Sequence, residues 1–424
     1  MNQITPDTPT IKSFFKLHFK EILLVILILC LALFFRLWNL SERINFSGDQ
    51  AESSLRAFEL WQNKEFTLVG PITSWQLNDL HAHTSSLSYY LQLLLLLPNN
   101  FDPLRATFTM AVIAALMIIP LYLGARKIVG CFPALFLTAI YALLPFFIDY
   151  TTFLWNPNFQ LILAPLAIFT LGLYYSSKKN YWLSIFGFVL GLMLTLHYQF
   201  ALALIGLLCF FLFRKKFKEL LWLILGLIIG FSPVILLELN TSFYNTKILL
   251  GLLTNLGSAT NGFPPLHYFM VSGFFLILFL TFILKNKITR PVFWTTLVFL
   301  TLLNIFIYFP KQKNSFSAPT NWFYQNELIT NSLIVQHAAP NFNILNLAYI
   351  DPLANVQKYL IAIKTPQLYE QLSPSYYENT QLFIIAPKDY DFSKAINYEI
   401  TTFEPVKQTQ WNINPNYSLH LWER

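Results

Sequence analysis

A group of polar side chains follows the first long apolar run of the sequence, and its residue types suit acid–base chemistry. Asp49 lies in Phe46-Ser47-Gly48-Asp49-Gln50, with Glu52 and Arg56 close behind. A positioned carboxylate can accept the proton of a hydroxyl group while that hydroxyl attacks an electrophile. On a helix that begins near Asp49, Glu52 and Arg56 share its face. The stretch predicts a general base, and it equally predicts a capped helix with Asp49 as N-cap and Glu52 completing a capping box.

Further polar side chains lie at the boundaries of apolar runs, where a protein can contact a membrane-borne substrate. Arg36 and Arg105 can each hold a lipid phosphate through paired hydrogen bonds, or extend to ordinary headgroups. Trp155 beside Asn156 can bind a sugar, although tryptophan is also the usual interfacial anchor. The remaining candidate binding residues are His83, Asp149, His197 and Gln199.

The elements that position these residues are predicted to be membrane spans. The chain has 424 residues, of which 55% are hydrophobic and only 12% charged. A span needs about 17 to 25 mostly apolar residues, and the sequence contains about nine suitable runs. They are Glu21–Leu40, Leu104–Leu123, Cys131–Ile148, Phe159–Tyr175, Tyr181–Leu196, Gln199–Phe213, Glu219–Leu237, Leu266–Leu284 and Val292–Phe309.

The lysines and arginines between these runs predict the orientation, since short basic loops stay cytoplasmic. With nine spans, every basic cluster falls on the side of the N-terminus. Leu87–Leu97 is too short to cross and is predicted to be a helix at the outer interface. Tyr181–Phe213 is too long for one span and is predicted to turn back near His197-Tyr198-Gln199. The three cysteines lie in apolar runs and predict neither disulfides nor a metal site.

The sequence thus predicts a membrane domain over residues 1–309, with its first outer loop at 41–103, and a small extracytoplasmic α/β domain over residues 310–424. Strands are expected at Phe342–Ile350, Gln381–Ala386 and Tyr398–Phe403, and a helix at Asp351–Ile363. A final hairpin is expected to turn at Trp411–Pro415 and end in the strand Tyr417–Trp422. The net charge of +7 belongs to the membrane part and indicates topology, not nucleic-acid binding.

The order of short motifs resembles that of GT-C membrane glycosyltransferases, in particular family 39, which includes the protein O-mannosyltransferases and the lipid A aminoarabinose transferase. The motifs, which cover the chain to about Phe309, are Gly48-Asp49-Gln50-Ala51-Glu52, Leu68-Val69-Gly70-Pro71-Ile72-Thr73-Ser74, Ser88-Tyr89-Tyr90, Arg105, Trp155-Asn156-Pro157 and Leu196-His197-Tyr198-Gln199. Family members often carry a second acid where this chain has Gln50.

This resemblance implies a polytopic α-helical membrane protein of the GT-C type that transfers a sugar with inversion. The donor would be a polyprenyl-phosphate sugar, and the acceptor a hydroxyl of a protein, lipid or glycan at the extracytoplasmic face of the cell membrane. Asp49 matches the family's first-loop acid, the base that deprotonates the acceptor. Arg105 matches the arginine that steadies the leaving phosphate.

Other functions remain open on the sequence alone. A polyprenyl-linked polymerase or ligase would use the same donor on the same side, and a catalytically inactive scaffold would use the tail as its interaction module. A transporter or flippase usually carries charged residues near the membrane midplane, and the predicted spans are nearly free of them. Asp49, His81 and His83 carry groups that suit a divalent metal, but the relatives do not uniformly need one, and no cofactor is predicted.

Overall fold

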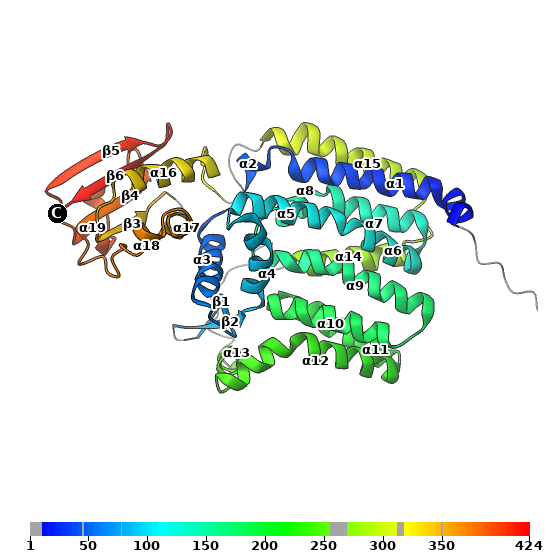
Figure 1. Ribbon diagram of the computed structural model, residues 1–424. Coiled ribbons are helices and arrows are strands. Elements are labelled where there is room, and N and C mark those ends of the chain that lie inside the picture. Colours follow the sequence, from blue (N-terminus) through cyan, green and yellow to red (C-terminus); the bar gives the residue numbers. More distant parts are fainter. Residues whose placement is uncertain (1–10, 45, 78, 255–268, 312–317, 349–350) are drawn as a thin grey trace, which may run out of the picture.

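The computed structural model describes residues 11–44, 46–77, 79–254, 269–311, 318–348 and 351–424. Long helices lie side by side in a bundle, and the C-terminal part of the chain forms a separate lobe beyond one end of it (Figure 1). The start of α1 lies at the opposite end of the bundle, as do the turns from α9 to α10 and from α11 to α12. The bundle therefore has one end that carries short turns and one end that carries elaborate structure.

The bundle is built from helices that correspond to the predicted apolar runs. They are α1 (Ile11–Leu37), α5 (Pro103–Leu116), α6 (Ile118–Val129), α7 (Cys131–Leu143), α8 (Pro145–Tyr150), α9 (Asn158–Ser177), α10 (Tyr181–Leu196), α11 (Ala201–Phe213), α12 (Phe217–Asn240), α14 (Met270–Ile283) and α15 (Arg290–Leu303). The last continues through a wider π turn at Asn304–Tyr308. The first three residues of the predicted span Leu266–Leu284 lie outside the described residues.

Four helical stretches in the described part of the chain are long and apolar enough to cross a membrane. They are Pro103–Val129, Asn158–Ser177, Phe217–Asn240 and Arg290–Lys311, and shorter apolar helices accompany them. The predicted reversal near His197 is confirmed, because α10 ends at Leu196 and a short 3-10 turn at Tyr198–Phe200 leads into α11. The core of the bundle is made of buried aliphatic and aromatic side chains from nearly all of these helices.

The first loop between α1 and α5 is folded throughout most of its length. It contains α2 (Leu40–Arg43), α3 (Gly48–Asn63), the antiparallel strands β1 (Val69–Leu77) and β2 (Leu80–Ser85), and α4 (Leu87–Leu96). The helix predicted at Leu87–Leu97 is present, and α3 and α4 run across the direction of the bundle helices (Figure 1). The β1–β2 hairpin was not predicted, and α13 (Tyr244–Thr254) packs against it.

The C-terminal lobe contains a four-stranded sheet in the order β3-β4-β6-β5. Its strands are β3 (Phe342–Asn346), β4 (Gln381–Pro387), β5 (Lys407–Asn412) and β6 (Tyr417–Glu423), and its helices are α16 (Tyr324–His337), α17 (Asn355–Lys364), α18 (Pro366–Tyr369) and α19 (Tyr398–Thr401). β3 and β4 are parallel, and β6 is antiparallel to both β4 and β5. The strand predicted at 342–350 is present in its first part, since β3 ends at Asn346 and residues 349 and 350 lie outside the described residues. The strand predicted at 381–386 and the final hairpin are confirmed.

The strand predicted at Tyr398–Phe403 is wrong. This segment forms the short helix α19, and its two apolar residues Ile400 and Phe403 are buried three positions apart. That spacing places both side chains on one face of a helical turn, where they pack with Trp422 of β6. Tertiary packing therefore decides the conformation of a segment whose composition favours a strand.

The lobe packs directly on the first loop. One hydrophobic cluster contains residues of both parts. It joins Ile44, Phe46 and Ala51 of the loop to buried residues of α16 and α17. The Phe46 ring lies 5.3 Å from that of Tyr359 and 6.1 Å from that of Tyr324, measured between centroids. The start of α3 is thereby held between the bundle and the lobe.

Candidate active site

The start of α3 carries the predicted base, but the helix is capped differently from the prediction. Ser47 is the N-cap, and Gln50 Oε1 accepts hydrogen bonds from both the backbone N–H and the hydroxyl of Ser47. The predicted box of Asp49 and Glu52 is therefore wrong, because the helix begins earlier in the chain. Gln50 completes the cap, and the carboxylate of Asp49 in the first turn has no part in it.

Asp49 is exposed to solvent, whereas its neighbours Gly48 and Gln50 are buried. Partial loss of hydration nevertheless raises the pKa of the Asp49 carboxyl above its ordinary value. The pKa of Glu52 is raised for the same reason and further by the charge of Asp49. An accessible carboxylate with a raised pKa, in the favourable field of a helix N-terminus, is suited to accept a proton from a substrate hydroxyl.

A second carboxylate, which the sequence did not single out, lies beside this helix start. Asp351 of the C-terminal lobe is buried, and a Cβ placed on Gly48 would lie 3.0 Å from its Oδ1. Asp351 Oδ1 accepts a hydrogen bond from the backbone N–H of Asn355 at 3.1 Å. The predicted helix Asp351–Ile363 thus begins later, with the Asp351 side chain bonding its first turn. An acid just before an apolar-periodic segment was the only signal in the sequence.

Arg56 lies farther along α3 and pairs with acids of the same loop. Its guanidinium forms ion pairs of 3.3 Å with both Glu59 and Glu65. Arg105 is mostly exposed at the first turn of α5, where Asp102 is its ion-pair partner at 3.9 Å. Asp102 also accepts hydrogen bonds from the first amides of α5. Of these two arginines, Arg105 is the one whose guanidinium remains available to a phosphate.

Asp149 belongs to a separate buried group. The hydroxyl of Tyr308, at the end of the last bundle helix, donates a hydrogen bond to its carboxylate. The positive charge of Arg43 acts on the same carboxylate. Arg43 itself donates to the backbone oxygens of Phe35, Arg36 and Trp38. This group ties the end of α1 to α8 and to the last helix.

His197 and Gln199 both bond to one buried amide, that of Gln160, and Trp155 and Asn156 lie in the turn before α9. Gln160 Nε2 donates to the backbone oxygens of Met193 and His197, at 2.6 and 2.8 Å. Gln199 Nε2 donates to Gln160 Oε1 at 2.7 Å, and Asn156 Nδ2 donates to Leu196 O at 3.3 Å. The Trp155 ring stacks near Phe153, with centroids 6.0 Å apart. These contacts join the start of α9 to the end of α10.

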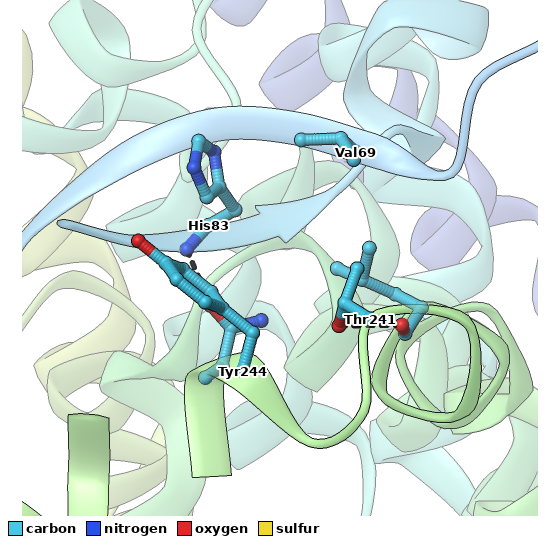
Figure 2. Close-up of a pocket in the computed structure, with 6 residues that line it drawn as sticks. Val69, His83, Thr241 and Tyr244 are labelled. Carbon is cyan, nitrogen blue, oxygen red and sulfur yellow. Dashed lines mark hydrogen bonds between the residues drawn. The ribbon is translucent and has the colours of Figure 1, made fainter. Parts of the chain in front are cut away.

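His83 lines a cavity of about 230 Å³ between the hairpin and the ends of α12 and α13 (Figure 2). Its backbone N–H donates to Asn245 Oδ1 at 2.7 Å, and its ring faces that of Tyr244 with centroids 6.1 Å apart. Val69, Leu237 and Thr241 complete the lining, so the cavity is largely apolar. His83 therefore lies in a different place from the start of α3.

Arg36 has neither of the two roles expected for it. The side chain is fully buried and donates to the backbone oxygens of Tyr141 and Ala142, at 3.0 and 2.7 Å, and to the hydroxyl of Thr151 at 3.0 Å. Pro145 follows four residues after Tyr141 and has no N–H to continue the helix. Arg36 thus satisfies carbonyls that the break between α7 and α8 leaves without helical partners.

Within the described residues, no group of three or more His, Cys, Asp or Glu side chains has the arrangement of a metal site. His81 and His83 each place a ring nitrogen near a backbone oxygen of β1, that of Thr73 and that of Gly70. Two carboxylates lie at the start of α3. That of Asp49 is accessible, and that of Asp351 is buried behind Gly48.

Comparisons with known proteins give one family match and two solved structures of similar fold. Residues 83–238 match the family model described as dolichyl-phosphate-mannose-protein mannosyltransferase. The crystal structure of ArnT from Cupriavidus metallidurans in the apo state has a similar fold, with a TM-score of 0.55 and 10% sequence identity over 96% of this chain and 98% of that chain. The structure of the same protein bound to undecaprenyl phosphate gives a TM-score of 0.51 and 10% identity over 95% and 98%.

No curated protein sequence matches the chain significantly. The structural similarity extends through the C-terminal lobe, since it covers nearly all of both chains. The family match includes β2, α4 and the helices up to the end of α12. The family match thus covers the central part of the chain, and the similarity to ArnT is one of fold.

Proposed function

We propose that the protein transfers a sugar from a polyprenyl-phosphate-linked donor to an acceptor hydroxyl at the extracytoplasmic membrane face, with Asp49 as general base. The observation that carries this proposal is the accessible Asp49 carboxylate at the start of α3, at the elaborated end of the helical bundle. The undecaprenyl phosphate bound by ArnT, a protein of the same fold, supports the class of donor.

The proposed reaction is a single displacement at the anomeric carbon of the sugar. The acceptor oxygen forms the new bond to that carbon while Asp49 takes the hydroxyl proton. The bond from the carbon to the phosphate oxygen breaks, and polyprenyl phosphate leaves with the electron pair. Attack from the face opposite the leaving group inverts the anomeric configuration. Arg105, exposed at the start of α5, would balance the charge that grows on the departing phosphate.

The proposal requires the elaborated end of the bundle to be extracytoplasmic and the N-terminus to be cytoplasmic. The basic residues Lys178 and Lys179 belong to the turn from α9 to α10, and this turn lies at the end where α1 begins, as the preference of basic loops for the cytoplasm requires. Reporter fusions at Lys178 and at the C-terminus are expected to report opposite sides. The same side for both would contradict the proposed orientation.

The catalytic role of Asp49 is tested with purified full-length protein in proteoliposomes and a panel of polyprenyl-phosphate sugars. Asp49→Asn keeps the shape of the side chain and removes the base, so donor consumption should fall by about 10²- to 10⁴-fold. Glu42→Gln, which changes an exposed acid of the same loop, is the matched control and should retain the wild-type rate. Undiminished turnover by Asp49→Asn would overturn the assignment.

A further inference from the structure

The buried carboxylate of Asp351 has no role in the reaction described above. It belongs to the C-terminal lobe, far from Asp49 in the sequence, yet it lies against the backbone at the start of α3. Its exposed fraction is 3%, and its oxygens accept hydrogen bonds from the amides of Asn355 and Val356, at 3.1 and 3.3 Å. A buried acid at a boundary between two parts of a protein is costly unless the packing around it holds it there.

Gly48 makes this close approach possible. A Cβ at this position would lie 3.0 Å from Asp351 Oδ1 and 3.1 Å from both Cβ and Cγ of Asp351. These distances are shorter than ordinary carbon contacts, so a larger residue would push the carboxylate away. The absence of a side chain at Gly48 thus lets an acid of the lobe lie one residue away from the proposed base.

The lobe is held in this position by specific contacts. The hydroxyl of Tyr359 donates to the backbone oxygen of Phe101 at 2.6 Å, and that of Tyr369 donates to Glu59 at 3.1 Å. We propose that Asp351 is a positioning residue for Asp49: docking of the lobe places a second carboxylate behind Gly48, fixes the start of α3 and thereby sets the pH range in which the base works. This inference rests on the proposed function.

The charges around Asp351 support a coupling between the two acids. Burial raises the pKa of the Asp351 carboxyl to about 7, and the charge of Asp49 contributes in the same direction. The amides of Asn355 and Val356 and the charge of Lys358 act against this rise, and Tyr376 also faces the carboxylate. Two neighbouring carboxylates cannot both ionise freely, so the charge of Asp49 makes loss of the Asp351 proton harder.

The coupling is tested by comparing Asp351→Asn with wild type, both as full-length protein in proteoliposomes. In wild type, ionisation of the buried Asp351 above its pKa should weaken the docking of the lobe and lower the rate, whereas Asp351→Asn stays neutral. The alkaline limb of the rate profile for consumption of a polyprenyl-phosphate sugar should therefore move to higher pH in this variant by about one unit, which corresponds to about 1.4 kcal/mol. Asp391→Asn is the matched control, since it neutralises an exposed acid of the same lobe, and it should leave the limb in place. Asp351→Ser, which keeps a side-chain oxygen suited to capping, is the second variant in case Asp351→Asn folds poorly.

Infrared titration of the carboxyl groups gives a readout that does not depend on turnover. The band lost in Asp351→Asn identifies Asp351, and in Asp49→Asn this band should titrate at lower pH than in wild type. An Asp351→Asn rate that is lower at every pH with an unchanged limb, together with an Asp351 band that is unchanged in Asp49→Asn, would overturn the inference and leave the proposed function standing. If the wild-type protein consumes no donor, the proposed function fails, and the infrared titration alone decides the coupling.

Discussion

The hydroxyl of Tyr359 donates a hydrogen bond of 2.6 Å to the backbone carbonyl of Phe101. Tyr359 lies on α17 of the C-terminal lobe, and Phe101 lies in the turn between α4 and α5, where its φ angle of 59° marks a left-handed conformation. The same tyrosine ring contacts Phe46, at the other end of the first loop. One side chain of the lobe therefore touches both ends of the loop that carries Asp49.

Replacing Tyr359 with phenylalanine should weaken the docking of the lobe. The variant keeps the buried ring and removes only the hydroxyl, which leaves the partly buried carbonyl of Phe101 without this donor. The expected loss of stability is about 1 kcal/mol. The lobe should become more sensitive to limited proteolysis in the native state. Tyr398→Phe, at an exposed position of the lobe, is the control, and equal cleavage of the two variants would contradict this role of Tyr359.

The stability of the protein should fall as the pH rises through about 7, because of Asp351. The folded protein raises the pKa of this carboxyl from 3.8 to about 7, so the folded state binds the proton more tightly than the unfolded chain. The resulting stability is complete below pH 3.8 and is lost as the pH passes the folded value. Thermal unfolding measured from pH 5 to pH 8 should therefore show a decline that is smaller in Asp351→Asn. Parallel curves for the two proteins would refute this assignment.

Close packing of α10 against α12 should make glycine at position 226 indispensable. A Cβ at Gly226 would lie 1.8 Å from the backbone oxygen of Ser184, and one at Gly187 would lie 2.1 Å from that of Leu223. Small residues four apart let membrane helices approach closely. Gly226→Ala should destabilise the protein by about 1 to 3 kcal/mol through overpacking, measured as thermal unfolding in detergent. Gly206→Ala, where a Cβ meets open space, should have little effect.

The sequence predicted the helices well because membrane spans are long and apolar, and that signal depends on composition more than on packing. It missed the hairpin of β1 and β2, whose register shifts twice between Val69 and Gln76. Such irregularities break the alternation of apolar and polar residues by which strands are recognised. Gly70 and Pro71 also reduce the tendency of this segment to be read as a strand.

The candidate site was predictable only in part, for a related reason. Asp49 stood out because it is an acid directly after a span, and the structure leaves it accessible. The role of Gln50 in capping depends on where the helix begins, which sequence reasoning places only within a few residues. Asp351 could not be placed beside Gly48, since that contact arises from the docking of the lobe. Arg36 was misread because its carbonyl partners appear only once α7 is known to break at Pro145.

Arg36 stabilises the break between α7 and α8 from within the bundle, so its replacement should lower the stability of the protein. Arg36→Met keeps an apolar stem but removes three hydrogen bonds, two of them to the buried carbonyls of Tyr141 and Ala142. Each carbonyl left without a partner costs about 1 to 3 kcal/mol, so the unfolding temperature in detergent should fall markedly. Arg105→Met, at an exposed position, should have little effect.

A second substitution distinguishes this explanation from a general loss of packing. Pro145→Ala restores a backbone N–H four residues after Tyr141, so α7 can itself satisfy the carbonyl of Tyr141. In the Arg36→Met background this change should recover part of the lost stability, whereas in wild type it should bring little gain. The two substitutions are therefore expected to be non-additive in a double-mutant cycle. Strict additivity would mean that Arg36 stabilises the bundle by some contact other than its bonds at the helix break.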